Sequence, residues 1–341
     1  MSSDRRAYFV ALILCILLIA GALLALLLGS ADISVPDVFG ALFGSEDSDM
    51  ARFVVVETRL PAMLTSVFAG AALALAGLLM QTCFNNPLAG PSIMGISSGA
   101  SLGVALVIML GSSYVGLWGK FAIVSGAFVG AMAVLAVLLV FSFVVRSAEM
   151  LLIIGILVGY LTSSIISLLN YFASERAVHS FVLWGLGNFN SVDLSAMPVF
   201  AGLCIIFILG SFPYIRSLNT LLFGTEYARS VGVDVSRVRG GLLIVAGALT
   251  AVVTAWCGPI GFIGLVVPHI VRMSLASSNH RRVLPFTVLA GAVIGVWCLV
   301  LSVLPSVWRP GNMPINAITP IIGVPVIIYV LLNRRKILYF N

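Results

Sequence analysis

Long apolar runs separated by short polar segments dominate the pattern of this chain. The runs lie at 7–29, 61–82, 92–111, 118–145, 150–172, 193–213, 240–257, 283–304 and 317–332. Because a bilayer-spanning helix needs about 20 predominantly apolar residues, the runs predict transmembrane helices. The first run follows Arg5 and Arg6 and is longer than the apolar core of a signal peptide, which is about 7–15 residues. We interpret it as a retained first helix.

The run from Gly241 to Arg272 is too long for one helix, and Gly258-Pro259 interrupts it. Positive charge decides between one crossing and two, because cytoplasmic loops are enriched in lysine and arginine. Two crossings, the second short or broken, give ten in all, with both termini and 13 of the 18 lysines and arginines on the inner side. These are Arg5, Arg6, Arg146, Arg216, Arg229, Arg237, Arg239, Arg272, Arg281, Arg282, Arg334, Arg335 and Lys336. The pattern therefore predicts an all-α polytopic membrane protein of about ten transmembrane helices.

The polar segment Gln81–Pro91 separates two of these runs. Pro87 and Pro91 lack a backbone donor and push the residues before them away from helical angles. One helix is therefore expected to end near Thr82 and the next to begin near Ser92. Non-helical backbone at membrane depth persists only when it is buried in protein or lines a cavity. Spacing alone favours a plain hairpin between two spans over a functional hinge.

Composition supports the membrane assignment. Hydrophobic residues make up 61% and charged residues 9% of the chain, and the mean hydropathy is +1.17, whereas soluble domains carry roughly a quarter charged residues. The net charge of +6 does not indicate nucleic acid, because the basic residues are scattered among loop ends. The five cysteines lack a CxxC pair and lie mostly in apolar runs, so we interpret them as small core residues.

Residues that would carry catalysis or ion coupling are scarce. The sequence has no GxxxxGK[ST] phosphate loop, and therefore no ATP site of the usual kind. His179, His269 and His280 are far apart, so neither a metal site nor a cofactor is expected. His269 and His280 flank a basic inner loop and are expected to be solvated or to cap helices. No acid lies near the middle of a predicted span, although ion-coupled carriers usually need one, so enzyme and secondary-carrier hypotheses are both weakened.

Two longer polar segments connect the predicted spans. Residues 30–58 form an expected extracytoplasmic loop, in which Asp37–Phe43 has the pattern of a short amphipathic helix. Residues 213–240 form an inner loop, in which Thr225 opens a predicted short polar helix, Thr225–Ser230, and Gly232 follows as a stop signal. One interpretation is a solvated loop helix. The other, favoured because the chain lacks a motor of its own, is a docking site for a cytosolic partner.

Glycines four residues apart recur at Gly99/Gly103, Gly126/Gly130, Gly155/Gly159 and Gly291/Gly295. Small residues at that spacing let helix backbones approach closely in lipid. Glycine is also simply common in membrane helices, but four such pairs together predict a compact bundle.

Four segments together strongly resemble one transporter family. They are the stretch 70–101 with NPLAGP, FGTEYARSVGVDVSRVR at 223–239, GPIGFIGLVVPHIVR at 258–272 with HRRVLP at 280–285, and NMPINAITPIIGVP at 312–325. The family is the FecCD-type permeases, the membrane subunits of bacterial ABC importers for iron–siderophore chelates, haem and cobalamin. The resemblance covers nearly the whole chain in the same order. It implies a single transmembrane permease domain over residues 1–341, with a type II ABC importer bundle of ten helices.

The resemblance also implies roles for residues at matching positions. The implied inner gate of the translocation path consists of Asn86, Leu88, Ser147, Ala148, Glu149 and Met150. Glu149 departs from the small hydroxyl residues usual there. The implied coupling helix, which would sit in a groove of the ATPase, consists of Thr225, Glu226, Tyr227, Ala228, Arg229, Ser230, Val231, Gly232 and Val233. With the resemblance, Gln81–Pro91 is expected to be half of a gate and no longer a plain hairpin.

Residues implied to dock a binding protein depart from the family pattern. Arg59 matches the first expected arginine on the outer side, but Ala62 replaces the next one, and a later arginine pattern is missing. The usual Glu-x-Pro-x-Gly motif is replaced by NMPIN at 312–316. Arg52 and Arg309 are the expected substitutes. Because surface ion pairs contribute only about 0–1 kcal/mol each, docking tolerates such changes.

The resemblance further implies an assembly with other chains. A second permease copy, two cytosolic ATPase subunits and an extracytoplasmic binding protein are expected, in a bacterial inner membrane with both termini cytoplasmic. The expected function is ATP-driven import of a metal chelate, iron–siderophore first and haem or cobalamin next, with no enzymatic activity in this chain. An ion-coupled secondary transporter and a stand-alone channel for a small apolar solute are the alternatives. The predicted path has no histidine, tyrosine or acid cluster that would separate one chelate from another.

Overall fold

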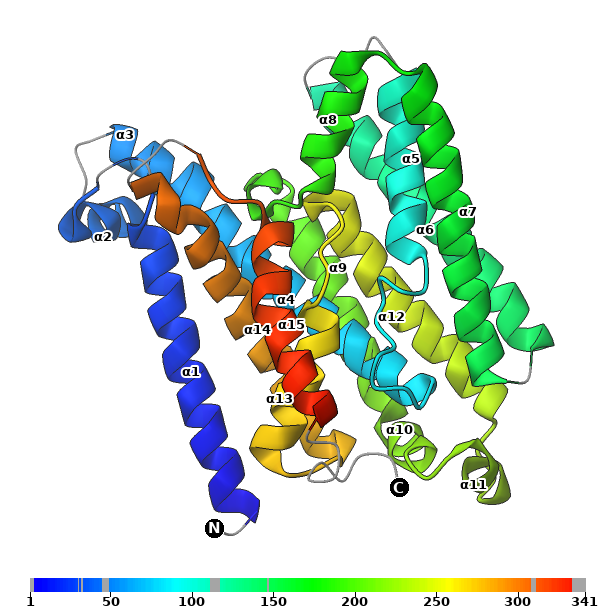
Figure 1. Cartoon of the computed structure of the whole chain (residues 1–341). Coiled ribbons are helices and arrows are strands. Elements are labelled where there is room, and N and C mark those ends of the chain that lie inside the picture. The colour runs from blue at the N-terminus through cyan, green and yellow to red at the C-terminus, as the bar shows by residue number, and fades with distance from the viewer. Residues whose placement is uncertain are drawn as a thin grey trace.

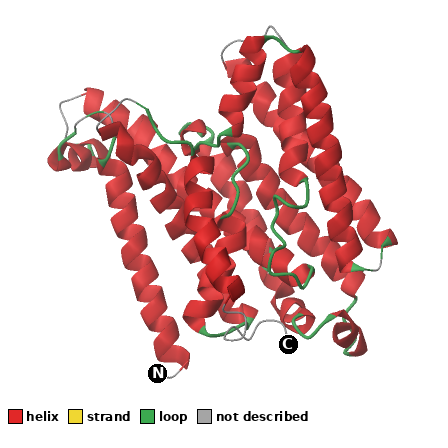
Figure 2. Cartoon of the chain, viewed as in Figure 1, coloured by secondary structure: helices red, strands yellow, loops and turns green. Residues whose placement is uncertain are grey.

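The structure is a computed structural model that describes residues 3–29, 31, 33–44, 49–110, 117–145, 147–307 and 311–332. Over these residues the chain is helical and has no β-strand (Figure 2). Seven helices are long and apolar enough to cross a membrane, and three shorter apolar helices accompany them. Together they account for the ten helices expected from the sequence, so the all-α polytopic fold is confirmed.

The spanning elements follow the predicted runs closely. The long spanning elements are α1 (Ser3–Leu27), α4 (Leu60–Cys83), α6 (Leu117–Val144), α7 (Ala148–Phe172), α12 (Val235–Cys257) and α14 (His280–Val303), together with α9 (Met197–Gly210), whose span continues to Leu221. The short apolar helices are α5 (Ile96–Leu110), α13 (Ile263–Leu275) and α15 (Ile315–Leu332). Connecting elements are α2 (Val35–Phe43), α3 (Asp49–Arg52), the π-helical η1 (Phe53–Arg59), α8 (Glu175–Gly185), α10 (Ile215–Leu221) and α11 (Thr225–Ser230), with 3₁₀ turns η2 (Phe189–Ser191), η3 (Phe212–Tyr214) and η4 (Leu304–Val307).

Helices α4 and α12 form the centre of the bundle. The share of buried residues is 78% in the span ending with α4 and 83% in α12, but 17% in α1 and in α7. Helix α4 packs against α9, α12, α13 and α14, whereas α7 packs mainly on α5 and α1 mainly on α14. In Figure 1, α10, α11, the start of α1 and the end of α15 lie at one end of the bundle, which we call the α11 end. Helices α2, α3 and α8 lie at the opposite end, the α2 end.

The predicted glycine pairs lie where helix backbones approach each other. A Cβ added to Gly99 of α5 would lie 2.6 Å from the carbonyl oxygen of Gly130 in α6, and one added to Gly291 of α14 would lie 2.5 Å from that of Gly70 in α4. Gly155 of α7 lies against the backbone of the loop before α5. No side chain fits at such distances, so the close packing predicted from the glycine spacing is confirmed.

The run between Gly241 and Arg272 is two helices, as the charge distribution predicted. Helix α12 ends at Cys257, residues 258–262 are non-helical, and α13 begins at Ile263. Phe262 has a φ of 65°, a left-handed value that is uncommon for a bulky residue. Helix α13 has 13 residues, so the second segment is short, as expected.

The predicted boundaries fail at two places. Helix α5 begins at Ile96 and not near Ser92, because residues 91–95 form turns and Gly95 adopts a φ of 76°. Within the expected loop 30–58, α2 confirms the short helix predicted there, but residues 49–59 are also helical and run directly into α4. Pro61 has no amide hydrogen, and the backbone bonding shifts from the π-helical to the α-helical pattern just before it.

Helix α8 was not predicted. Its signals are present in the sequence: Ser174 accepts a hydrogen bond from the Ala177 amide at the N-cap, and Glu175 occupies the first turn. Helix α8 lies between two predicted spans and packs against α5 at the α2 end (Figure 1). Because it is too short to cross a bilayer, the search for spanning runs overlooked it.

Candidate functional site

The loop between α4 and α5, residues 84–95, is non-helical backbone held against the bundle. The Oδ1 atom of Asn86 accepts a hydrogen bond from the Leu88 amide at 2.9 Å, and the Asn86 amide donates to the Gln81 carbonyl at 3.0 Å. Ala89 is fully buried, whereas Leu88 is 40% exposed. The predicted hinge is therefore a hydrogen-bonded turn, shaped by Asn86, that presents the side chain of Leu88.

The start of α7 carries the second predicted gate segment. Ser147 caps the helix by accepting a hydrogen bond from the Met150 amide at 3.3 Å, and its hydroxyl donates to the carboxylate of Glu149 at 2.5 Å. Ala148 is buried and Met150 is exposed. A carboxylate in the first turn of a helix is favoured by the helix dipole. Glu149, the departure from the family pattern, is thus accommodated locally by this helix terminus.

Helix α11 spans Thr225–Ser230, as predicted. It is bracketed by two glycines with left-handed φ values, Gly224 at 97° and Gly232 at 86°. The N-cap is Gly224, and Thr225 is the first helical residue, as expected. The flanking segment through Val233 leads to α12, and Val231 is exposed.

One face of α11 is anchored and the other is open. Ala228 is fully buried and fixes the helix to the bundle. Tyr227 is 50% exposed and lies beside exposed Phe223, with 5.3 Å between ring centroids. Glu226 and Arg229 form an exposed ion pair at 2.9 Å. An aromatic pair flanked by charges, on a short rigid helix at the end of a bundle, is suited to binding another protein.

A cleft of about 510 Å³ brings three predicted segments together at the α11 end. Its lining comes from the end of α4 and the start of the loop 84–95, from the start of α7, and from α10 and α11. The lining residues are Thr82, Cys83, Phe84, Asn85, Ser147, Ala148, Glu149, Leu221, Phe223, Gly224, Thr225, Glu226, Tyr227 and Arg229. Both predicted gate segments thus border one cleft with the predicted coupling helix. Asn86, Leu88 and Met150 lie outside this lining, as do Ala228 and residues 230–233.

Helix α7 exposes a polar stripe that the sequence reasoning missed. Tyr160, Ser164, Ser167 and Tyr171 follow one another at spacings of three and four residues, so they lie on one face, and all are exposed. The neighbouring exposed stripe is apolar and consists of Leu157, Leu161, Leu168 and Phe172. The helical spacing of the hydroxyl residues was a signal available in the sequence. Hydroxyls on a membrane helix are best placed toward protein or water, and not toward lipid.

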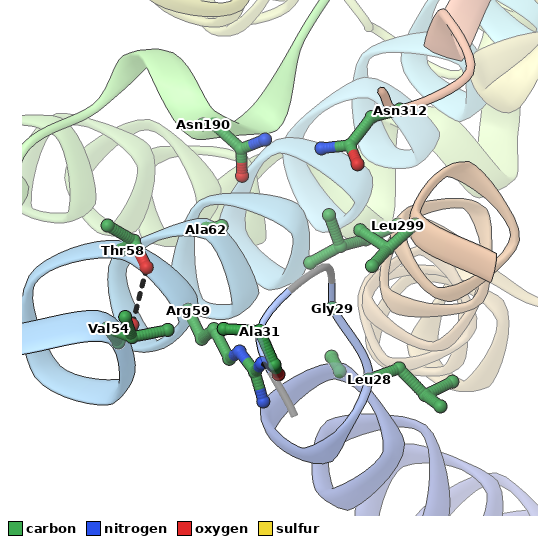
Figure 3. A pocket seen from close by; sticks show the side chains of 12 residues that line it. Leu28, Gly29, Ala31, Val54, Thr58, Arg59, Ala62, Asn190, Leu299 and Asn312 are labelled. Atoms are coloured by element: carbon green, nitrogen blue, oxygen red, sulfur yellow. Dashed lines mark hydrogen bonds between the residues drawn. The ribbon is translucent and has the colours of Figure 1, made fainter. Parts of the chain in front are cut away.

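A second pocket, of about 320 Å³, lies at the α2 end between α1, the η1–α4 junction and α14 (Figure 3). Asn190 and Asn312 extend toward one another at its rim in Figure 3. Arg59, predicted to dock a binding protein, is buried on the floor of this region. Its guanidinium donates to the carbonyls of Leu26 and Leu27 at 2.8 Å each, and to that of Ala31 at 2.6 Å. The structure therefore places Arg59 as a cap on the carbonyl end of α1.

The other predicted docking arginines lie in different surroundings. Arg52 is exposed at the end of α3, on the α2 end of the bundle (Figure 1). Arg309 lies outside the described residues. Among the described residues, Arg52 is therefore the predicted docking arginine whose side chain is exposed to solvent.

Replacing Arg59 by methionine is expected to lower the free energy of unfolding by about 1–3 kcal/mol, because three carbonyls at the end of α1 lose a charged donor. Thermal unfolding of the purified protein in detergent measures this. The matched control is Arg52→Met, which removes an exposed arginine nearby and is expected to leave the melting temperature unchanged. Equal melting temperatures for the two variants would contradict the capping role.

For His269 and His280, expected either to be solvated or to cap helices, solvation is wrong. Both are buried, with 1% and 0% exposure. His269 Nε2 lies 2.9 Å from the Pro87 carbonyl oxygen, and His280 Nε2 lies 2.9 Å from the Thr82 hydroxyl. Positions near helix ends looked solvent-exposed in the sequence, but neighbouring helices cover His269 near the end of α13 and His280 at the start of α14. Buried Arg272 and the half-buried Asn219 belong to the same polar cluster, and sequence reasoning missed their roles.

Over the described residues, ten apolar helices form the bundle, with non-helical segments between α4 and α5 and between α12 and α13, and an anchored short helix beside a cleft. This is the fold of a type II ABC importer permease, a transport subunit without enzymatic activity. The chain belongs to the FecCD transport family, which matches residues 16–333. It is accordingly a multi-pass membrane protein of the inner membrane.

Several known proteins are similar over nearly their whole length. The hemin transport system permease protein HmuU of Yersinia pestis is 33% identical, with 92% of this chain and 94% of the relative covered. The molybdate import system permease protein MolB of Haemophilus influenzae is 32% identical (92% and 92%), and the vitamin B12 import system permease protein BtuC of Citrobacter koseri is 32% identical (95% and 94%). A solved structure of an ABC transporter assigned to the metal-chelate type, in an inward-facing conformation, superposes with a TM-score of 0.81 at 29% identity, covering 94% of this chain and 97% of that one.

Proposed function

We propose that this permease forms the path of an ATP-driven importer for a metal chelate, and that its α11 end is where an ATPase partner acts on the gate. The observation that carries this proposal is the 510 Å³ cleft, which joins the end of α4, the start of α7 and α11. A partner that displaces α11 would change the walls of the same cleft that both gate segments border. The whole chain, residues 1–341, acts in this proposal as one translocation domain.

The gate in this proposal has two sides. Asn86 holds the turn that presents Leu88, and Ser147–Met150 form the opposing edge at the start of α7. A second copy of the chain completes the path. The exposed stripe of Tyr160, Ser164, Ser167 and Tyr171 supports this arrangement, because a polar face on a membrane helix is more stable against a water-filled path than against lipid.

The proposed cargo is a bulky metal chelate. The relatives described above are permeases for hemin, molybdate and vitamin B12, so they do not single out the iron–siderophore chelate that came first in the sequence-based expectation. The exposed stripe on α7 combines hydroxyl and aromatic groups and carries no carboxylate, histidine or basic side chain. Such a surface binds weakly, which allows cargo to pass. We therefore propose a chelate that is recognised mainly by a separate binding protein, with iron–siderophore, haem and cobalamin as the compounds to test.

The proposed partners are two cytosolic ATPase subunits at α11 and an extracytoplasmic binding protein at the α2 end. The exposed arginines Arg216, Arg229 and Arg237 lie around α11, which supports a cytoplasmic position for that end and for both termini. At the α2 end, Arg52 is the arginine proposed to contact the binding protein, with Arg309 as a second candidate.

Transport assays in proteoliposomes test the proposal. The chain is reconstituted with the ATPase and binding protein encoded nearby, and uptake of hemin, cobalamin and a ferric hydroxamate chelate is measured. We expect uptake of one of them to require ATP and to persist when ion gradients are collapsed. ATP-independent uptake without any ATPase would indicate a channel. Uptake that stops when the ion gradient is collapsed, while ATP hydrolysis continues, would indicate an ion-coupled carrier.

Replacing Leu88 by alanine is expected to raise passive leak of the transported chelate roughly tenfold, because removing an apolar side chain from a closed gate costs about 1.5 kcal/mol. Efflux from loaded proteoliposomes without ATP measures the leak. Leu110→Ala, which truncates an exposed leucine at the opposite end of α5, is the control and is expected to leave the leak unchanged. Equal leak in the two variants would remove Leu88 from the gate.

A further inference from the structure

A buried polar cluster lies directly beneath the loop 84–95. Arg272 of α13 is 1% exposed, and its Nη1 donates to the Oε1 atom of Gln81 at 3.0 Å while its Nη2 donates to the Thr82 hydroxyl at 3.5 Å. Gln81 in turn donates through Nε2 to the Leu265 carbonyl at 3.0 Å. Gln81 and Thr82 occupy the last turn of α4, immediately before the hinge. The guanidinium therefore fixes the end of α4 to α13.

The cluster continues from α4 to α14 and α10. His280, the first residue of α14, places Nε2 at 2.9 Å from the Thr82 hydroxyl and Nδ1 at 3.0 Å from Oδ1 of Asn219 in α10. The His280 amide also donates to that Oδ1 atom, at 2.7 Å. Because an amide oxygen only accepts, we assign the proton of His280 to Nδ1, which lets Nε2 accept from Thr82.

These contacts are continuous from element to element. Arg272 donates to the Thr82 hydroxyl, whose single proton is shared between the Leu78 carbonyl at 3.0 Å and His280 Nε2 at 2.9 Å. His280 donates to Asn219, and the Nδ2 atom of Asn219 donates to the Oδ1 atom of Asn279 at 3.0 Å. Each member is paired, and releasing one partner would leave a buried polar group without its bond. The end of α4, the last turn of α13, the start of α14 and α10 are consequently held as one unit.

The two ends of this unit are the predicted gate and the predicted coupling helix. On the gate side, the Gln81 carbonyl accepts from the Asn86 amide, and His269, one turn before Arg272 on α13, reaches the Pro87 carbonyl at 2.9 Å. On the other side, α10 ends at Leu221 and is joined to α11 by three residues. Helix α10 also packs against α4 and α14.

We propose that Asn219, His280, Thr82, Gln81 and Arg272, which we call the α10–α4 relay, transmit displacement of α11 to the gate loop. The proposal rests on the proposed function, because it assumes that a partner moves α11. Helix α11 packs mainly against α10 and α12, so its displacement reaches the end of α4 through these neighbouring elements. The relay residues are positioning residues: they touch the hinge and α10, and not the cargo.

Two adjacent residues on α10 provide the test. Asn219→Ala removes the bond between α10 and α14, whereas Thr220→Ala removes a hydroxyl that bonds only within α10, to the Arg216 carbonyl at 2.9 Å. Both residues are half-buried, so the packing changes are comparable. In the reconstituted importer, Asn219→Ala is expected to keep ATP hydrolysis while chelate uptake falls by about fivefold or more, a size typical of coupling between sites. Thr220→Ala is expected to keep the ratio of ATP hydrolysed to chelate transported.

A second readout is independent of the cargo. A single reporter thiol, Leu88→Cys in a background where Cys15, Cys83, Cys204, Cys257 and Cys298 are replaced by serine or alanine, is labelled with a maleimide while the ATPase partner binds a non-hydrolysable ATP analogue. In the parent protein and in Thr220→Ala, the nucleotide is expected to change the labelling rate, and in Asn219→Ala it is not. An equal response in Asn219→Ala and Thr220→Ala overturns the relay alone. No response even in the parent protein overturns the proposed function and the relay together.

Arg272 gives an independent variant for the same measurement. Arg272→Lys keeps the buried positive charge but cannot reach Gln81 and Thr82 with two planar donors. It is expected to reduce the nucleotide response of the Leu88→Cys label, as Asn219→Ala does. A full response in a folded Arg272→Lys protein would exclude the guanidinium from the relay.

Discussion

Replacing Gly103 by alanine is expected to destabilise the folded bundle by about 3 kcal/mol, at the upper end of overpacking costs. A Cβ at this position of α5 would overlap the carbonyl oxygen of Gly126 in α6. The obstacles are the carbonyl oxygen and carbon of Gly126, which are backbone atoms, so no side-chain rotation relieves the overlap and the two helices must separate. Thermal unfolding in lipid nanodiscs, followed by tryptophan fluorescence, measures the loss.

The same substitution at Gly202 is the control. Gly202 lies in α9, and no atom lies within 4 Å of a Cβ added there. Gly202→Ala is expected to keep or slightly raise stability, because alanine favours the helix by roughly 0.5–1 kcal/mol over glycine. Equal unfolding temperatures for the Gly103 and Gly202 variants would show that the α5–α6 contact tolerates a methyl group and would contradict the packing described above.

Replacing Tyr227 by alanine is expected to abolish most of the stimulation of the ATPase partner by the permease. Tyr227 is the half-exposed aromatic residue of α11, and Ala228 beside it anchors the helix, so the ring is presented without a large entropic cost. Truncating such an aromatic anchor at an interface costs about 2 kcal/mol or more, which corresponds to roughly 30-fold in affinity. Co-purification of the ATPase with the permease, and permease-stimulated ATP hydrolysis, both measure the effect.

Phe121→Ala serves as the control for Tyr227→Ala. Phe121 is 68% exposed on α6, away from the cleft, so it tests the general effect of losing an exposed aromatic ring. We expect ATPase binding to be unchanged in this variant. Normal stimulation of the ATPase by Tyr227→Ala would contradict the assignment of α11 as the coupling helix.

The spanning helices and α11 could be predicted because their signals are local. Apolar runs define spans by length alone, and Gly224 and Gly232 delimit α11 within a polar segment. The division of residues 241–272 into α12 and α13 also followed from local signals, namely Gly258-Pro259 and the arginines beyond it. These features depend on backbone hydrogen bonding and on the free energy of transferring apolar segments into lipid. Both are determined by residues that are close together in the sequence.

The roles of Arg59, His280 and Arg272 could not be predicted because their partners are distant in sequence. Arg59 bonds to carbonyls 28–33 positions earlier, and Arg272 bonds to residues about 190 positions away. A charged side chain near a predicted helix end looks solvent-exposed until the packing of other helices over it is known. For Arg59, the resemblance also predicted an exposed side chain that docks a binding protein. In the structure, its guanidinium is buried and donates hydrogen bonds to the carbonyls at the end of α1.

The position of α1 has a consequence for how the chain assembles during synthesis. Its main partner is α14: the Trp297 indole donates to the Leu17 carbonyl 280 positions earlier, and Asp4 pairs with Arg282. Helix α1 therefore enters the membrane long before the surface on which it packs has been made. In the interval, the end of α1 is held by Arg59 and by packing against α2, η1 and α4. We expect a ribosome-bound chain that stops before α14 to contain α1 as a loosely tethered helix that a protease or a crosslinker can still reach.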